Sequence, residues 1–248
     1  MRAAERNIPD MAVARVSAVL GAFDARHREL RVSEVSRRAG LPMSTTSRLV
    51  ADLVTYGFLE RTGPSLRIGV RVFEIGEFAA RRRDLRTIAP PYLADLREAT
   101  GLSVHLAVLE ATDVVYVEVL RGRDAPSMPS EVGGRLPAHA SAVGKALLAF
   151  SGEPAISLVC DQPLRMVGPR TITAPGLLRR QLARIRECGV AYESEESGAG
   201  VGCVASAVLY ADGRPAGAVS VSGWADRLDL RAVGPAVRTV ALGISRQL

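Results

Sequence analysis

The chain has 248 residues, of which 48% are hydrophobic, 23% charged and only 4% aromatic, with a formal net charge of +6. This length predicts one or two domains that can bury a core without disulfides, and the composition excludes wholesale disorder. No run of about 18 or more apolar residues occurs, and the N-terminus lacks the apolar segment of a secretory signal. We therefore expect a soluble, cytoplasmic protein without a membrane partner.

The three cysteines of the chain are Cys160, Cys188 and Cys203. An odd number without a C-x-x-C pair argues against a disulfide framework and against a zinc finger. We expect reduced and partly buried thiols. The histidines and cysteines lack the spacing of metal ligands, and no phosphate-loop pattern is complete. The sequence therefore predicts neither a metal site nor a cofactor.

The basic excess lies near the N-terminus. Residues 1–85 contain 15 arginines and 10 acidic residues, a balance of +5, whereas residues 86–248 have a balance of only +1. A localised basic surface is typical of a protein that binds a polyanion. The alternative is a solvated surface without a partner.

The first 69 residues begin with helical patterns. Apolar side chains at helical spacing predict a helix over residues 11–24. Ser33 is a suitable N-cap for a short helix over 34–39. Gly40 would end that helix in a left-handed conformation.

A further helix and a hairpin follow. The helix would begin at Pro42 or Ser44 and end near Tyr56, with a polar outer face. Two short strands, 58–61 and 66–68, would flank a Gly-Pro turn. Helix, helix, turn, helix and hairpin in this order predict a winged helix-turn-helix.

In such a domain the last helix enters the major groove and the hairpin lies along the phosphates. Arginine side chains can position a protein on the phosphates, and the candidates for this role are Arg48, Arg61 and Arg67. Side chains that can meet base edges or a thymine methyl group are Met43, Ser44, Thr45 and Ser47. The alternative is a three-helix packing module without DNA, but the hairpin and the basic balance favour DNA binding.

Residues 70–83 predict a helix with a broad apolar face that ends in three arginines. A helix over 91–99 follows Pro90-Pro91, since proline is well tolerated in a first turn. We interpret these two helices as a linker through which two copies of the chain form a dimer. The alternative is that the first helix packs on its own domain.

The remaining sequence alternates between strands and helices. The predicted strands are 104–109, 114–119, 190–195, 201–210 and 216–222, and the predicted helices are 140–150, 153–160, 175–188 and about 230–247. The segment 121–138 is expected to be a loop. Consecutive strands with tight turns predict an antiparallel sheet flanked by helices, an α+β sensor domain.

Two other classes of function remain open at this point. One is an enzyme, for example a hydrolase that uses Cys203 with His139. No nucleophile-elbow pattern supports it around Ser141, so we expect no catalytic residues. The other is a sensor module that acts without DNA.

Several segments resemble one family. Residues 40–49, GLPMSTTSRL, resemble the recognition-helix motif of the IclR (isocitrate lyase regulator) family, and residues 66–69 resemble its wing. Residues 134–148, GRLPAHASAVGKALL, resemble its most characteristic stretch. Residues 203–205 and 218–223 complete the resemblance, which spans roughly residues 11–245 with the spacing intact.

The resemblance implies a ligand-responsive transcriptional regulator with three parts. These are a winged helix-turn-helix over 1–70, linker and dimerisation helices over 71–100, and a GAF-like effector-binding domain over 101–248. Its expected partners are a double-stranded DNA operator, a small organic or aromatic acid, and further copies of the chain in a homodimer or tetramer.

The effector pocket of the family also carries over by position. Its residues would be Leu136, Ala142, Val143, Glu193, Cys203, Ser220 and Ser222. Backbone N–H groups at a helix start near Ala142 can hold a carboxylate. Ser220 and Ser222 are two apart on a strand, so both hydroxyl groups can face one pocket.

Overall fold

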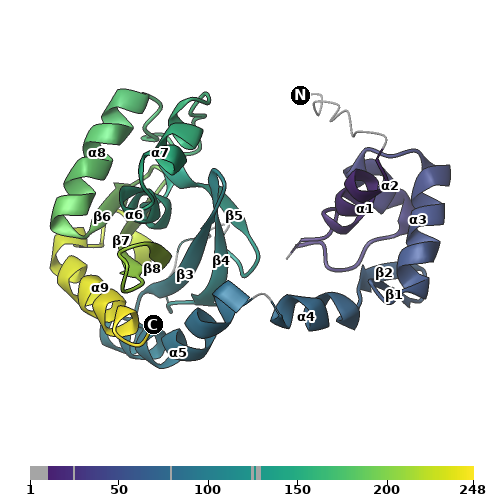
Figure 1. Ribbon diagram of the computed structural model, residues 1–248, viewed down its shortest axis with the longest axis horizontal. Helices are drawn as coiled ribbons and strands as arrows, with labels where there is room; N and C mark the ends of the chain where they lie inside the picture. Colours follow the sequence, from purple (N-terminus) through teal and green to yellow (C-terminus); the bar gives the residue numbers. More distant parts are fainter. Residues whose placement is uncertain (1–10, 25, 79, 124–125, 127–129) are drawn as a thin grey trace. The chain divides into compact units, whose positions relative to one another are not determined.

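The computed structural model describes residues 11–24, 26–78, 80–123, 126 and 130–248. The chain folds into two compact units, Met1–Ala80 and Arg81–Leu248 (Figure 1). Within the described ranges, no helix is both long and apolar enough to cross a membrane.

The N-terminal unit combines helices with a two-stranded hairpin. Its elements are α1 (Ala12–Leu20), α2 (Val32–Ala39), α3 (Met43–Thr55), β1 (Leu59–Thr62), β2 (Ser65–Ile68) and α4 (Val70–Glu77). Val19, Val35, Val50 and Leu66 are among the side chains that form its core. The predicted order of elements is confirmed, although α1 ends at Leu20 rather than near residue 24.

The start of α2 differs from the prediction and its end agrees with it. The N-cap is Arg31 and not Ser33, because Glu34 satisfies the first backbone donor: its Oε2 accepts a hydrogen bond from Arg31 N–H at 2.8 Å. At the other end, Gly40 has the predicted left-handed conformation, with φ of 67°. The tight turn there leads directly into α3.

The hairpin is attached to the helices through its second strand. β1 and β2 pair antiparallel, with Leu59 opposite Ile68. Leu30 N–H donates to the Leu66 carbonyl at 3.0 Å, and Leu66 N–H donates to the Leu30 carbonyl at 2.8 Å. Since Leu66 is fully buried, the base of the wing is fixed on the helical core.

Helix α5 (Ala80–Thr100) runs through Pro90 and Pro91 without a break. The sequence predicted a separate helix over 91–99, because a proline inside a helix removes a hydrogen bond. Burial of one apolar face outweighs that cost here. The residues of this face are between 0 and 2% exposed and pack in the core of the C-terminal unit; they are Leu85, Ala89, Leu93 and Leu96.

The C-terminal unit is a six-stranded antiparallel sheet in the order β5-β4-β3-β8-β7-β6, with helices on both faces (Figure 1). Its strands are β3 (Ser103–Glu110), β4 (Asp113–Leu120), β5 (Arg135–Pro137), β6 (Ala191–Ser194), β7 (Val201–Leu209) and β8 (Pro215–Trp224). Its other helices are η1 (Ala138–Ala140), α6 (Ala142–Phe150), α7 (Glu153–Cys160), α8 (Pro175–Cys188) and α9 (Leu230–Ser245). β5 and η1 lie in or beside a segment that was predicted to be a loop.

The two faces of the sheet carry different side chains. α5 and α9 cover one face, whose strands carry mainly valines and leucines, whereas α6, α7 and α8 cover the other, whose strand residues include several alanines, Cys203 and Tyr116. Along β8, Val219 and Val221 belong to the first face. Ser220 and Ser222 therefore point toward the second face, because side chains alternate along a strand.

Candidate functional site

The first half of α3 presents a polar face to solvent. Its exposed or half-buried side chains include Met43, Ser44, Thr45, Ser47 and Arg48. The opposite face packs in the core of the unit through Thr46, Val50 and Leu53. The five predicted residues of this helix are therefore accessible together, and an α-helix fits the major groove of B-DNA.

The three candidate phosphate contacts are not equivalent. Arg48 and Arg61 are exposed, and neither makes an ion pair with another described residue. Arg67 is already paired, because its Nη2 lies 2.7 Å from Glu60 Oε2 and its Nε donates to the same oxygen at 2.9 Å. The hydrogen bond from Arg67 lowers the pKa of Glu60. The Glu60 carboxylate in turn offsets part of the positive charge of this wing arginine.

The second candidate site lies inside the C-terminal unit. The seven predicted effector residues are all buried, none of them more than 6% exposed. Strand register brings Glu193 opposite Cys203 and Cys203 opposite Ser222. Ser220 lies two residues before Ser222 on the same face of β8. The fold thus gathers four polar side chains from three neighbouring strands on the face that α6 covers.

The start of α6 completes this face. Leu136, Ala142 and Val143 pack in the cluster that lines it. Ser141 caps the helix, since its Oγ accepts a hydrogen bond from Gly144 N–H at 3.1 Å. The N–H groups of Ala142 and Val143 have no partner within the helix, as in the first turn of any helix, so they can serve an anion.

A histidine that the sequence did not assign to the pocket shares the same face. His105 lies opposite Ser220 in the sheet. Its Nε2 is 3.0 Å from Ser130 Oγ, and its ring meets the edge of Tyr116 at a centroid distance of 5.5 Å. Burial lowers the pKa of His105 to about 3, so the imidazole is neutral. The sequence signal that could have assigned His105 to the pocket is its position inside an apolar strand.

Comparison with known proteins decides the family. The IclR helix-turn-helix domain matches residues 12–63, and the family described as bacterial transcriptional regulator IclR C-terminal matches residues 77–246. The chain belongs to the IclR family. It is a DNA-binding transcriptional regulator with a C-terminal domain that binds a ligand, and the resemblance stated from its motifs is confirmed.

Relatives of this IclR-family regulator are known in several bacteria. It is 33% identical to the HTH-type transcriptional regulator XynR of Escherichia coli over 88% of this chain and 87% of that protein. It is 32% identical to the transcriptional repressor IclR of the same organism over 79% of this chain and 74% of that protein. An IclR homolog of Microbacterium hydrocarbonoxydans, crystallised with 4-hydroxybenzoate, matches with a TM-score of 0.85 and 33% identity over 95% and 98%. The crystal structure of Thermotoga maritima IclR matches with a TM-score of 0.75 and 28% identity, and the match covers 95% of this chain and 98% of that chain.

A buried ionic cluster supports the acidic end of the candidate pocket in this IclR-family regulator. Glu193 Oε1 accepts hydrogen bonds from Glu196 N–H at 3.0 Å and from both N–H and Oγ of Ser197 at 2.9 Å. Burial outweighs these bonds and raises the pKa of Glu193 to about 7. Lys145, which is fully buried, donates to Glu196 Oε1 at 2.6 Å and to the Tyr192 carbonyl at 3.0 Å. The lysine thus ties α6 to β6 and to the loop after it, which carries Glu196.

Proposed function

We propose that α3 reads an operator in the major groove through Met43, Ser44, Thr45 and Ser47, while Arg48, Arg61 and Arg67 contact phosphates. The exposure of the five α3 residues on one face supports this assignment. Arg48 and Arg61 make no ion pair within the described ranges of the chain, which supports the assignment further, because such an arginine can bind phosphate.

The effector in this proposal is a small aromatic or other organic acid held between the sheet and α6. Its carboxylate would accept hydrogen bonds from Ala142 and Val143 N–H at the helix start. Ser220 and Ser222 would bond its other polar group. Leu136, Cys203 and Glu193 would form the remaining walls.

The observation that carries the proposal is that strand pairing gathers Glu193, Cys203, Ser220 and Ser222 on one buried face of the sheet. This face lies under α6, whose first backbone N–H groups have no partner within the helix. Polar side chains that converge beside a helix start are typical of a site that orients a small ligand. The relative from Microbacterium hydrocarbonoxydans that binds 4-hydroxybenzoate supports an aromatic acid as the ligand class.

Titration calorimetry with 4-hydroxybenzoate tests this assignment. Wild-type protein should bind the acid, and the variant with Ser220→Ala and Ser222→Ala should bind at least about tenfold more weakly, since two hydrogen bonds are lost. Ser206→Ala is the matched control, because this buried serine donates to the Gly189 carbonyl instead. Equal loss in the control would show that only stability had changed.

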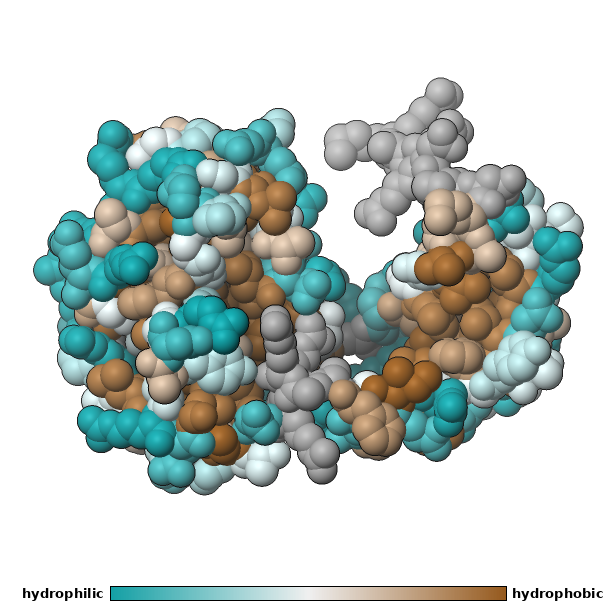
Figure 2. Space-filling model, in the orientation of Figure 1, coloured by the Kyte–Doolittle hydropathy of each residue, from teal (hydrophilic) through white to brown (hydrophobic). Residues whose placement is uncertain are grey.

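We further propose a homodimer that forms through the helices between residues 71 and 100. Helix α4 has no buried residue, and Figure 2 shows apolar side chains over it. Phe73 is 63% exposed and Phe78 is 83% exposed. An exposed apolar patch of this kind marks an interaction surface.

The known relatives are transcriptional regulators, and we propose that this chain has no enzymatic activity and needs no cofactor. The hydrolase alternative required Cys203 as a nucleophile. Burial raises the pKa of the Cys203 thiol well above its usual range. A thiol kept protonated is a poor nucleophile at neutral pH, which argues against that alternative.

A further inference from the structure

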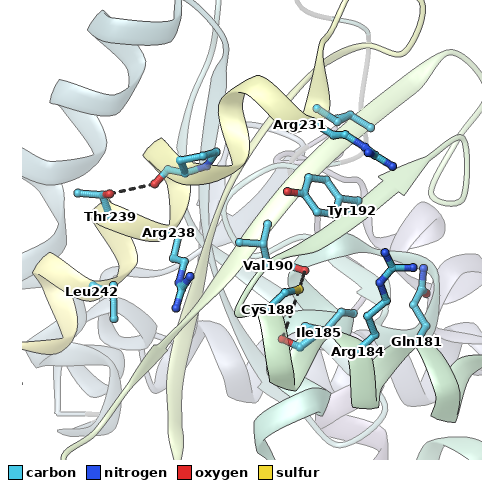
Figure 3. Close-up of a pocket in the computed structure, with 12 residues that line it drawn as sticks. Gln181, Arg184, Ile185, Cys188, Val190, Tyr192, Arg231, Arg238, Thr239 and Leu242 are labelled. Carbon is cyan, nitrogen blue, oxygen red and sulfur yellow. Dashed lines mark hydrogen bonds between the residues drawn. The ribbon is translucent and has the colours of Figure 1, made fainter.

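A groove of about 850 Å³ lies between α8, α9 and β6 in the C-terminal unit (Figure 3). None of the seven residues proposed for the effector lines it. Its volume falls in the range of small-molecule sites, roughly 300–1,000 Å³. The groove is therefore a separate candidate for a ligand.

The inner surface of the groove is apolar. Ile185 and Val190 are buried at its base, 4% and 6% exposed, and Leu242 lines one side of it from α9. The ring of Tyr192, 37% exposed, projects from β6 between α8 and α9 (Figure 3). Such a surface can cover the apolar body of a ligand, and burial of that body would favour binding.

Three arginines surround this apolar surface. Arg184 comes from α8, and Arg231 and Arg238 come from α9. All three are exposed, and none makes an ion pair within the part of the chain that the structure describes. No acidic side chain is among the described residues that line the groove. Guanidinium groups bind carboxylates and phosphates through paired hydrogen bonds, so the groove is suited to an anion.

The walls of the groove are closely packed where two glycines occur. A Cβ on Gly234 would lie 2.5 Å from the Tyr192 hydroxyl oxygen, and a Cβ on Gly189 would lie 3.1 Å from Arg238 Nε. These glycines let the tyrosine and the arginine rest against the backbone. Gln181 also lines the groove, and its Oε1 is buried with no hydrogen-bond donor among the residues that the structure describes. A donor group on a ligand would remove the cost of that unsatisfied acceptor.

We propose that this groove binds an organic anion with an apolar body and is a second ligand site in addition to the effector pocket. A second copy of the chain is a poorer occupant. A two-fold contact through this face would bring the arginines of both copies together, and like charges repel across an interface.

Calorimetry on the full-length protein with decanoate, a carboxylate with an apolar tail, tests the proposal. Wild type should bind decanoate, and Arg184→Gln with Arg238→Gln should weaken binding about tenfold or more, because charged hydrogen bonds are lost. Arg186→Gln with Arg246→Gln is the matched control: it removes the same charge from α8 and the C-cap of α9 outside the groove and should bind as wild type does. Ser220→Ala with Ser222→Ala should also leave binding unchanged. Inorganic phosphate, which has no apolar body, should bind at least about tenfold more weakly than decanoate.

Cys188 provides a second readout, because it lines the groove and is exposed whereas Cys160 and Cys203 are buried. Decanoate should slow the alkylation of Cys188 by iodoacetamide in wild type and in the control, but not in the Arg184 and Arg238 variant. The proposal is overturned if decanoate neither binds nor protects Cys188, if all variants bind it equally, or if phosphate binds as tightly. It is also overturned if Cys188 reacts slowly without decanoate and faster on dilution, which would show that another copy covers the groove.

Discussion

Individual residues of this regulator owe their properties to where the fold puts them. His105 is neutral because it is buried, and Glu193 holds its proton up to about pH 7 for the same reason. Arg48, in contrast, is exposed on the face of α3 that we assign to DNA. The proposed pocket therefore presents hydrogen-bonding groups of low charge, and the proposed DNA face presents free cations.

Removing one free cation should weaken DNA binding without unfolding the protein. We expect Arg48→Ala to lower operator affinity and to reduce the slope of log affinity against log salt by about 1, the effect of one phosphate contact. Fluorescence anisotropy at several salt concentrations measures both quantities. Arg186→Ala, an exposed arginine on α8, is the control. An unchanged affinity and slope for Arg48→Ala would contradict the assignment.

Glu193 should make stability depend on pH. Its pKa is raised in the folded state from 4.5 to about 7, so the unfolded chain loses this proton first as pH rises. The favourable contribution is complete below about pH 4.5 and is lost by about pH 7, a change of up to about 3 kcal/mol. Glu193→Gln keeps an oxygen that accepts hydrogen bonds but cannot titrate, so its free energy of unfolding should lack this fall. Urea unfolding across the range measures the difference. Parallel curves for the two proteins would refute the shifted pKa.

Helices α4 and α5 show how tertiary packing decides the extent and the role of an element. Local sequence predicted a break at Pro90-Pro91, but α5 continues because its apolar face is buried in the C-terminal unit. α4 has the same kind of apolar side chains and buries none of them. This contrast assigns the packing role to α5 and leaves α4 as the element available for a partner.

Polar substitutions on α4 should therefore break the proposed dimer. We expect Phe73→Ser with Phe78→Ser to give monomers in analytical ultracentrifugation, with little change in melting temperature because both rings are exposed. Leu177→Ser, which removes an exposed apolar side chain from α8, should leave the mass unchanged. If both variants sediment as the wild type does, α4 is not the interface.

The sequence predicted elements wherever the signal was local. Periodicity and turn residues found α3, the hairpin and the long strands, and the motif over 134–148 identified the family. What it missed depends on distant partners. The three-residue strand β5 exists through its pairing with β4, and His105 meets a serine 25 residues away. The gathering of Glu193, Cys203 and Ser222 required the strand order, which no local pattern gives.

At the scale of the whole molecule, the proposed effector pocket and the proposed DNA face lie in different compact units. A ligand can change DNA affinity only if it binds two states of the protein with different affinities. We propose that the helices between residues 71 and 100 connect those states. Linkage then requires that operator DNA change the affinity for the effector by the same factor.

Fluorescence anisotropy with DNA from the region upstream of the gene measures whether this regulator recognises an operator and responds to a ligand. We expect tight binding that resists competitor DNA and weakens steeply with salt. We also expect 4-hydroxybenzoate to change this binding in wild type but not in the variant with Ser220→Ala and Ser222→Ala. Weak binding that competitor removes completely, together with no site recovered from random-sequence selection, would show that the protein is not a sequence-specific regulator.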